Sequence, residues 1–320
     1  MYFIKVSSNP NLGKGHINRC LRIRDKIKSE VTWFIDKGTK KLFFNDINDK
    51  VYEEDSKNSF HKLEKKIVTS KIKAIIIDEV HLNKKKIKKL SQNYPVILIL
   101  DYYLQVSNTL RICLHPIPRI EKDFLSGFEY FPLYKKKTLS NIEKKIKILI
   151  AFGNIDSKGL TEKVIKIIID LFSNNSIDSK KVDINIVLGK YKKKKYLIKK
   201  SISLYSNFYL YSNLEKLDKL YKSTTFAIGA PGFSHLERIE YAIPTILLSQ
   251  NKIQKNLLSH WEKSKCCLVA KNKYDLKSKI LILVKSKIMN NKLKKNINTK
   301  FDSEGALRIV RKIENYVKSY

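Results

Sequence analysis

A loop near the N-terminus carries the residues best suited to acid–base chemistry. Gly13 and Gly15 stand on either side of one lysine, and His16 follows directly. Two closely spaced glycines let a backbone approach a ligand closely, and the N–H groups at the start of the next helix attract an anion. A histidine here can exchange protons near neutral pH, since its reference pKa is ~6.5. The pattern favours anion binding with proton transfer; a plain glycine turn between a strand and a helix is the alternative.

A second glycine-containing loop lies in the C-terminal half, between an apolar run and a helical segment. It contains Gly229 and Gly232, followed by Phe233, Ser234 and, one turn later, Glu237. Backbone N–H groups at the start of the helix suit a diphosphate, and the glutamate could accept both hydroxyl groups of a ribose. The alternative is a capping box, in which Ser234 and Glu237 serve only the helix end. Capping explains neither the glycines nor the intervening proline, so the loop is predicted to bind a nucleotide.

Two further candidate loops follow predicted strands and carry acidic residues. Gly153 and Asp156 come after the apolar run 146–152, and Asp101 ends the run 96–100. Ligands of parallel α/β sheets bind at the carboxyl ends of the strands, so both loops are candidate parts of a site. Each also has a simpler explanation, because Asp156 can cap a helix and aspartate is common where strands end.

Strands and helices that could position these loops alternate along the chain. Short β-branched runs recur between lysine-rich stretches of helical length, which predicts parallel sheets covered by helices. In the first series, strands are expected at 2–6, 31–35, 74–78, 96–101 and 111–114, and helices at 16–29, 57–69 and 83–92. In the second series, strands are expected at 146–152, 184–188, 208–211, 226–228, 245–248 and 267–270.

The length of 320 residues and the two series of strands predict two domains. The expected N-terminal domain is 1–138, with the histidine loop, and the expected C-terminal domain is 147–302. A polar, lysine-rich stretch at 135–146 is the predicted linker. Residues 303–320 have apolar side chains at helical spacing and are expected to form a helix that could pack back across the cleft. The predicted fold class is α/β, with two doubly wound Rossmann-like domains facing a central cleft.

The composition narrows the classes of partner. The net charge of +35 arises from 65 basic and 30 acidic residues, yet only eight of the basic residues are arginines. Because arginine is preferred for bidentate contacts with phosphates and bases, the lysines are interpreted as solvated helix faces rather than a nucleic-acid site. The four cysteines have neither metal-ligand nor disulfide spacing. The sequence has no signal-peptide pattern and no apolar run of ~20 residues, so a cytoplasmic protein is expected.

Four motifs, in their order and spacing, resemble the UDP-sugar hydrolases of pseudaminic acid biosynthesis, relatives of the GT-B glycosyltransferases and of the spore-coat polysaccharide protein group. The motifs are Gly13-x-Gly15-His16-x-x-Arg19-Cys20, Phe152-Gly153-x-x-Asp156, Gly229-Ala230-x-Gly232 with Glu237-Arg238, and Asn251 after a strand. The resemblance spans most of the chain and implies a GT-B-like fold. It also implies a hydrolase that needs no metal or other cofactor and removes UDP from a 2,4-diacetamido-2,4,6-trideoxy sugar.

The resemblance implies roles for single residues. His16 would be the base that activates water, and Glu237 would hold the ribose. Arg238 and Asn251 would support the nucleotide-binding loop, while Asp156 would line the cleft opposite.

The sequence departs from the family at three positions. Ser7, Lys252 and Val80 stand where the family usually has an aspartate, a glutamine and a tyrosine. Two of these positions, Ser7 and Val80, are expected on the sugar side, so they leave the identity of the sugar open.

Two other functions are compatible with the sequence. A GT-B glycosyltransferase would use the same nucleotide site, and the basic, apolar segment 40–44 could then contact a membrane near a lipid-linked acceptor or simply pack inward as a helix. A lysine-rich nucleic-acid-binding protein is the non-enzymatic alternative, and it predicts steeply salt-dependent binding. The preferred hypothesis is a monomer that binds a UDP-sugar and no nucleic acid, without an integral membrane segment.

Overall fold

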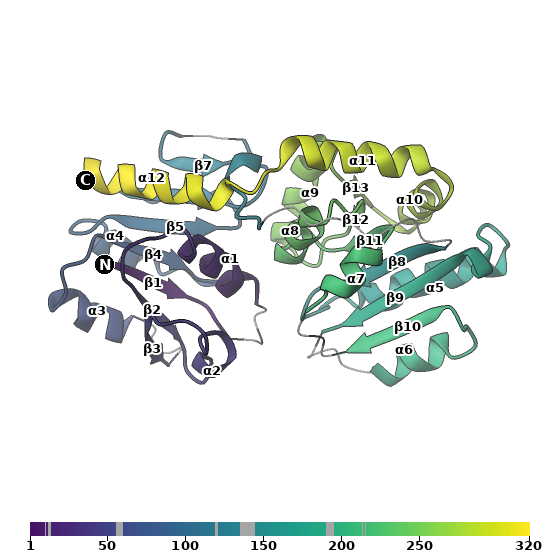
Figure 1. Ribbon diagram of the computed structural model, residues 1–320, viewed down its shortest axis with the longest axis horizontal. Coiled ribbons are helices and arrows are strands. Elements are labelled where there is room, and N and C mark those ends of the chain that lie inside the picture. The colour runs from purple at the N-terminus through teal and green to yellow at the C-terminus, as the bar shows by residue number, and fades with distance from the viewer. Residues whose placement is uncertain are drawn as a thin grey trace. The chain divides into compact units, whose positions relative to one another are not determined.

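The computed structural model describes residues 1–9, 11, 14–55, 60–118, 121–134, 145–189, 195–212, 214 and 216–320. The chain forms two compact units, coloured along the sequence in Figure 1. Unit 1 comprises residues 1–134 together with 303–320, and unit 2 comprises residues 135–302. Each unit is a parallel β-sheet with helices packed against it, so the prediction of two parallel α/β domains is confirmed.

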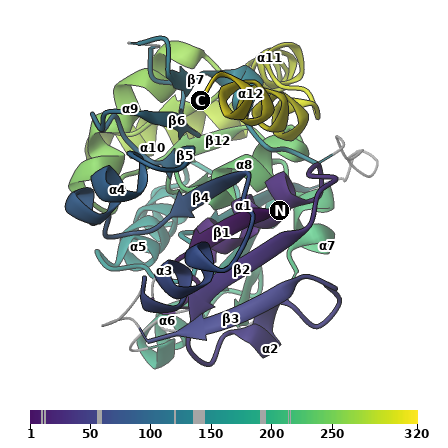
Figure 2. The same cartoon turned by 90° about the vertical axis from the view of Figure 1, so that its left-hand side faces the viewer.

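Unit 1 contains a seven-stranded sheet in the order β3-β2-β1-β4-β5-β6-β7, with all neighbouring strands parallel. Its strands are β1 (Tyr2–Val6), β2 (Val31–Asp36), β3 (Lys50–Glu54), β4 (Ala74–Asp78), β5 (Val96–Leu100), β6 (Thr109–Cys113) and β7 (Phe124–Ser126). The chain adds β2 and β3 on one side of β1 and then returns to place β4 on the other, as Figure 2 shows. The order therefore reverses between β1 and β4, and ligands of open α/β sheets bind at such a switch point.

Helices of unit 1 cover both faces of this sheet. They are α1 (Gly15–Arg24), α2 (Lys40–Phe43), α3 (His61–Val68), α4 (Lys84–Leu90), α12 (Gly305–Ser319) and the 3-10 helix η3 (Phe128–Tyr130). Ile17 of α1 and Ile309 of α12 share one apolar cluster with Trp33 of β2. Leu63 of α3 and Ile87 of α4 belong to a second apolar cluster. The C-terminal helix α12 is thus part of the core of unit 1.

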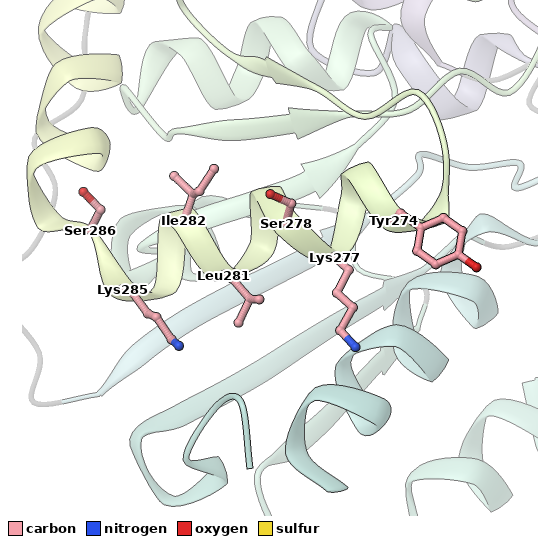
Figure 3. A pocket seen from close by; sticks show the side chains of 7 residues that line it. All are labelled: Tyr274, Lys277, Ser278, Leu281, Ile282, Lys285 and Ser286. Carbon is pink, nitrogen blue, oxygen red and sulfur yellow. The ribbon is translucent and has the colours of Figure 1, made fainter. Parts of the chain in front are cut away.

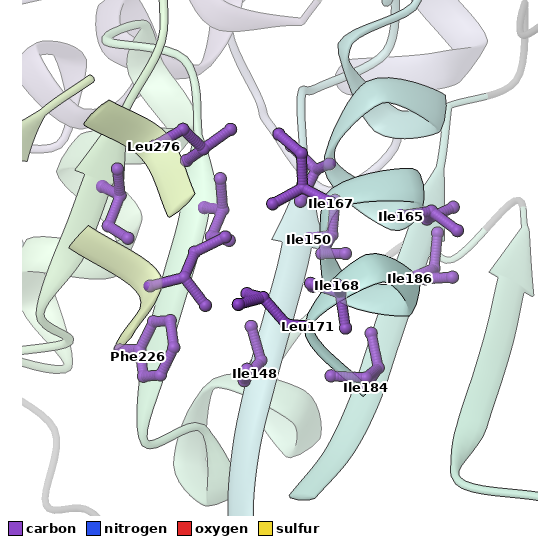
Figure 4. Close-up of a cluster of buried hydrophobic side chains, with 14 of the residues drawn as sticks. Ile148, Ile150, Ile165, Ile167, Ile168, Leu171, Ile184, Ile186, Phe226 and Leu276 are labelled. Atoms are coloured by element: carbon purple, nitrogen blue, oxygen red, sulfur yellow. The ribbon is translucent and has the colours of Figure 1, made fainter. Parts of the chain in front are cut away.

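Unit 2 contains a six-stranded parallel sheet in the order β10-β9-β8-β11-β12-β13. Its strands are β8 (Ile146–Ala151), β9 (Val182–Leu188), β10 (Phe208–Ser212), β11 (Phe226–Gly229), β12 (Thr245–Leu247) and β13 (Leu268–Val269). Its helices are α5 (Leu160–Ser173), η4 (Ser179–Lys181), α6 (Lys195–Ile202), α7 (Asp218–Ser223), α8 (Phe233–Glu240), α9 (Lys252–Ser264), α10 (Lys273–Lys285) and α11 (Lys287–Lys300). Figure 4 shows the isoleucine-rich core, where Ile150, Ile168 and Leu276 from three elements pack together.

Several predicted boundaries differ from the structure. Helix α1 ends at Arg24 rather than residue 29, because residues 25–27 form short turns instead of continuing the helix. Strands β3 and β7 were not predicted; β3 carries charged residues at both ends and β7 is only three residues long. The predicted linker lies almost entirely outside the described residues.

Candidate functional site

A histidine–aspartate pair lies at the switch point of unit 1. His16 is the second residue of α1, and Asp78 is the last residue of β4, the strand directly beside β1. His16 Nδ1 is 2.6 Å from Asp78 Oδ1, and the aspartate side chain is completely buried. A carboxylate that accepts the Nδ1 proton leaves Nε2 with its lone pair. The His16 side chain retains 16% of its exposure, so the pair can present a base to a ligand.

Arg19, one turn further along α1, joins this pair to a second aspartate. Its Nε and Nη2 donate to the two oxygens of Asp78, each at 2.6 Å, and its Nη1 donates to Asp101. Arg19 Nη2 also lies 3.0 Å from His16 Nδ1. Because an arginine is always protonated and carries no acceptor, the histidine Nδ1 proton is directed to Asp78 and not to the guanidinium.

The electrostatics of this cluster keep both carboxylates ionised. Burial alone would raise the pKa of Asp78, but the charges of Arg19 and His16 outweigh burial, so the pKa lies below its ordinary value. Burial acts in the same direction on Asp101, yet Arg19 and a contact with His115 hold the pKa of that carboxyl well below its usual range. An ionised Asp78 can accept the Nδ1 proton and stabilise an imidazolium.

Sequence reasoning selected His16, Arg19 and Asp101, and the structure brings these three together. The sequence reasoning did not select Asp78, which contacts both His16 and Arg19. It also did not select His115, whose Nε2 lies 3.6 Å from Asp101 Oδ1. Asp78 is the last residue of β4, and His115 follows the end of β6 by two residues, so their places after strands of the same sheet are the signal that could have identified them.

The loop between β1 and α1 is held by a further strand-terminal aspartate that the sequence analysis did not select. Asp36 Oδ2 accepts hydrogen bonds from the backbone N–H groups of Ser8 (2.6 Å) and Asn9 (2.8 Å). Gly15 is the first residue of α1, whereas Gly13 lies outside the described residues. The first part of the loop that leads to His16 is therefore anchored to β2.

The glycine loop of unit 2 leads into α8, which begins at Phe233 with Gly232 as its N-cap residue. Because the N-cap residue is a glycine and Ser234 lies inside the first turn, Ser234 is not in the N-cap position that the capping box considered for Ser234 and Glu237 requires. Glu237 instead accepts a hydrogen bond of 3.1 Å from the hydroxyl of Tyr221. The first N–H groups of a helix have no partners within the helix, which makes this end a suitable place for an anion.

Gly153 and Ser234 are neighbours in unit 2. Gly153 has a left-handed φ of +79°, and a Cβ atom on it would lie 3.8 Å from Ser234 Oγ. The side chain of Gln250 fixes the same loop, because its Nε2 donates to the carbonyl of Phe152 at 2.7 Å. The loops after β8, β11 and β12 are therefore adjacent.

Two other residues selected from the sequence have their side-chain oxygens engaged locally. Asp156 accepts the N–H groups of Leu160 (2.8 Å) and Thr161 (2.9 Å) at the start of α5. Asn251 is the N-cap of α9 and accepts the N–H of Gln254 at 2.8 Å. These contacts fit a helix-capping role for both residues.

A shallow pocket of about 520 Å³ lies elsewhere in unit 2, along α10 (Figure 3). Tyr274, Lys277 and Leu281 are among its lining residues. None of the residues selected from the sequence lines it. It therefore plays no part in the candidate site.

Comparison with solved structures identifies the fold. S. aureus MnaA, in a co-structure with UDP, is 14% identical with a TM-score of 0.70, covering 99% of this chain and 96% of its own. The glycotransferase of kitacinnamycin is 10% identical with a TM-score of 0.71, covering 98% of each chain. The fold is GT-B. A GT-B chain has two Rossmann-like domains, which here are units 1 and 2. Separately, no helix in the described residues is long and apolar enough to cross a membrane.

Sequence comparison adds one distant relative. No protein-family model matches the chain. An uncharacterised protein of Methanocaldococcus jannaschii is 24% identical over 284 residues, which cover 79% of this GT-B chain. The match extends over 56% of that protein, so the chain spans about half the length of its curated relative.

Proposed function

We propose that the chain is a hydrolase that cleaves a UDP-activated 2,4-diacetamido-2,4,6-trideoxyhexose to free sugar and UDP, as in pseudaminic acid-type biosynthesis. The observation that carries the proposal is the contact of 2.6 Å between His16 Nδ1 and the buried Asp78. That contact leaves Nε2 as the proton acceptor, which is the group a water-activating base requires.

In the proposed reaction, Nε2 of His16 removes a proton from water as the water oxygen attacks the anomeric carbon. The bond between that carbon and the phosphate oxygen breaks, and UDP leaves as an anion. Asp78 stabilises the imidazolium that forms, and Arg19 keeps Asp78 ionised and oriented. The leaving diphosphate needs little protonation, so one base suffices for the chemistry.

Unit 2 is proposed to hold the nucleotide. The start of α8, where the N-cap Gly232 has no side chain, offers backbone N–H groups to the diphosphate, and Glu237 is proposed to bind the ribose. The adjacent Gly153 supports this placement, because it has no side chain that would lie between a ligand and Ser234. The UDP in the MnaA co-structure supports a nucleotide in a GT-B protein.

The proposal is tested by incubating the protein with a panel of UDP-sugars without added metal or acceptor. Release of UDP from a diacetamido-trideoxyhexose donor is expected, and His16→Ala should abolish release while UDP affinity is retained. Turnover by His16→Ala at the normal rate would remove His16 from the mechanism.

A glycosyltransferase is the second candidate, and two observations favour it. The kitacinnamycin enzyme with the same fold is named a glycotransferase. In the segment 40–44, Phe43 and Phe44 pack against the apolar core of unit 1, whereas Leu42 is 56% exposed beside Lys40 and Lys41 and could contact a membrane. UDP release that depends on an added acceptor hydroxyl would favour this function over hydrolysis.

A further inference from the structure

Arg238 in α8 has an unusual environment for a charged side chain. It is completely buried, and its Nη2 donates a hydrogen bond of 2.9 Å to the carbonyl of Ala230. Its Nε and Nη1 have no hydrogen-bond partner among the described residues. Burial lowers the pKa of this guanidinium from its usual value. A buried cation with two unpaired nitrogens lowers the stability of the fold, so we expect its positive charge to have a role in ligand binding.

The guanidinium lies directly against the glycine turn that precedes α8. A Cβ atom on Gly229 would lie 2.8 Å from Arg238 Nη1 and 2.4 Å from the carbonyl oxygen of Ala151. Only glycine allows the end of β11 to pass this close to both groups. The arginine therefore supports the backbone from which the Gly232 N-cap follows.

Among the described residues, no acidic side chain forms a hydrogen bond with Arg238. Glu237 acts on Arg238 through its charge and accepts its own hydrogen bond from the Tyr221 hydroxyl. Burial and the charge of Glu237 raise the pKa of Tyr221 well above its ordinary value, so Tyr221 stays a neutral donor. The positive charge of Arg238 and the partial positive charge at the start of α8 therefore both act on the glycine turn between β11 and α8.

We propose that Arg238 is a positioning residue for a phosphate-bearing ligand at the start of α8. It holds the Ala230 carbonyl, and its charge adds to that of the helix N-terminus across a region of low dielectric. The inference rests on the proposed nucleotide site. It adds that binding of the diphosphate, rather than of the base or the ribose, depends on Arg238.

The test compares the affinities of UDP and uridine in the wild type, Arg238→Met and a control, Lys285→Met, which removes an exposed charge of the same unit. In Arg238→Met, the Kd of UDP is expected to rise about tenfold or more, while that of uridine stays within about twofold. The control should change neither. Equal weakening of both ligands, or of neither, would overturn the proposal, because a purely structural role of Arg238 does not distinguish them.

A measurement on the wild type keeps the proposal testable if Arg238→Met does not fold. Charges that are buried are screened weakly by salt, whereas surface lysines are screened strongly. The ratio of the uridine and UDP affinities is expected to change less than about threefold between about 0.05 and about 0.5 M salt. Collapse of the ratio would assign phosphate binding to surface lysines and refute the role of Arg238.

Inorganic pyrophosphate separates this inference from the proposed function. Binding of pyrophosphate that requires Arg238, without binding of uridine nucleotides, would refute the UDP-sugar function and leave the role of Arg238 intact. Binding of UDP that is unaffected in Arg238→Met would refute only the role of Arg238.

Discussion

At the residue scale, the candidate base depends on Asp78, which three side chains contact at once. His16 and Arg19 approach its two oxygens at 2.6 Å, and Cys20 Sγ lies 3.3 Å from Oδ2. A fully buried carboxylate is tolerated only when its oxygens are paired in this way. The same contacts orient the histidine, so one residue serves both folding and the proposed chemistry.

Replacement of Asp78 by asparagine should therefore affect both properties. We expect kcat for UDP release to fall ~10²- to 10⁴-fold, because an amide cannot accept all of these donors and no longer stabilises an imidazolium. The free energy of unfolding should fall by about 3–5 kcal/mol, since Arg19 loses the buried carboxylate that its Nε and Nη2 contact. Steady-state kinetics and chemical denaturation provide the two measurements.

Asp49 supplies a matched control for this variant. It forms a comparable bidentate pair with Arg24, at 2.6 Å for both contacts, and accepts from Trp33 Nε1 at 2.8 Å. Asp49→Asn should lower stability and leave kcat unchanged. A wild-type kcat in Asp78→Asn would contradict the proposed role of Asp78.

The lowered pKa values predict how acid destabilises unit 1. Asp78 and Asp101 have folded-state pKa values below their ordinary values, so each stabilises the fold above the unfolded-state pKa of ~3.9. This stability is lost as the pH falls from there through the depressed folded-state values. Unfolding free energies measured from about pH 5 to about pH 2 should fall less steeply for Asp101→Asn than for the wild type. Identical slopes would contradict the assignment.

At the element scale, the sequence predicted the ranges of several strands well, but it did not predict which side chains meet at the carboxyl ends of those strands. Strands β1 and β4 agree with the expected ranges to the residue, because both are short, mainly apolar runs: β1 contains a single lysine and is followed by Ser7, and β4 ends at Asp78. The edge strand β3 has the pattern of a solvated segment and was missed. The pairing of His16 with Asp78 joins residues 62 positions apart, and only the order of the strands brings them together.

The docking of α12 onto unit 1 gives a prediction about an element. A Cβ atom on Gly305 would lie 1.9 Å from the carbonyl oxygen of Phe131, so Gly305→Ala must displace the start of the helix. We expect a loss of roughly 1–3 kcal/mol in the free energy of unfolding. The exposed Lys312→Ala on the same helix should change stability by less than about 0.5 kcal/mol. Equal stability of both variants would argue against this close contact.

At the scale of the whole molecule, the charge of +35 needs an explanation that is compatible with the proposed enzymatic function. Lysines occupy exposed positions on helices of both units, for example Lys85 on α4 and Lys292 on α11, rather than forming one arginine-rich face. A dispersed charge of this kind attracts polyanions weakly and without specificity.

This interpretation predicts the salt dependence of nucleic-acid binding. Fluorescence anisotropy with an arbitrary DNA duplex should detect binding only at low salt, because counterion release supplies the whole affinity. At about 0.15 M salt no binding is expected at micromolar protein concentrations. Tight binding under that condition would support the nucleic-acid-binding alternative.

The central claim is that a water molecule activated by His16 attacks the anomeric carbon of a UDP-sugar. The most direct measurement is turnover of the UDP-diacetamido-trideoxyhexose in water enriched in oxygen-18, followed by mass spectrometry of both products. The label is expected at the anomeric position of the free sugar and not in UDP, with no product from His16→Ala. Label in the β-phosphate of UDP, or the same labelled sugar formed at the wild-type rate by His16→Ala, would contradict the proposed reaction.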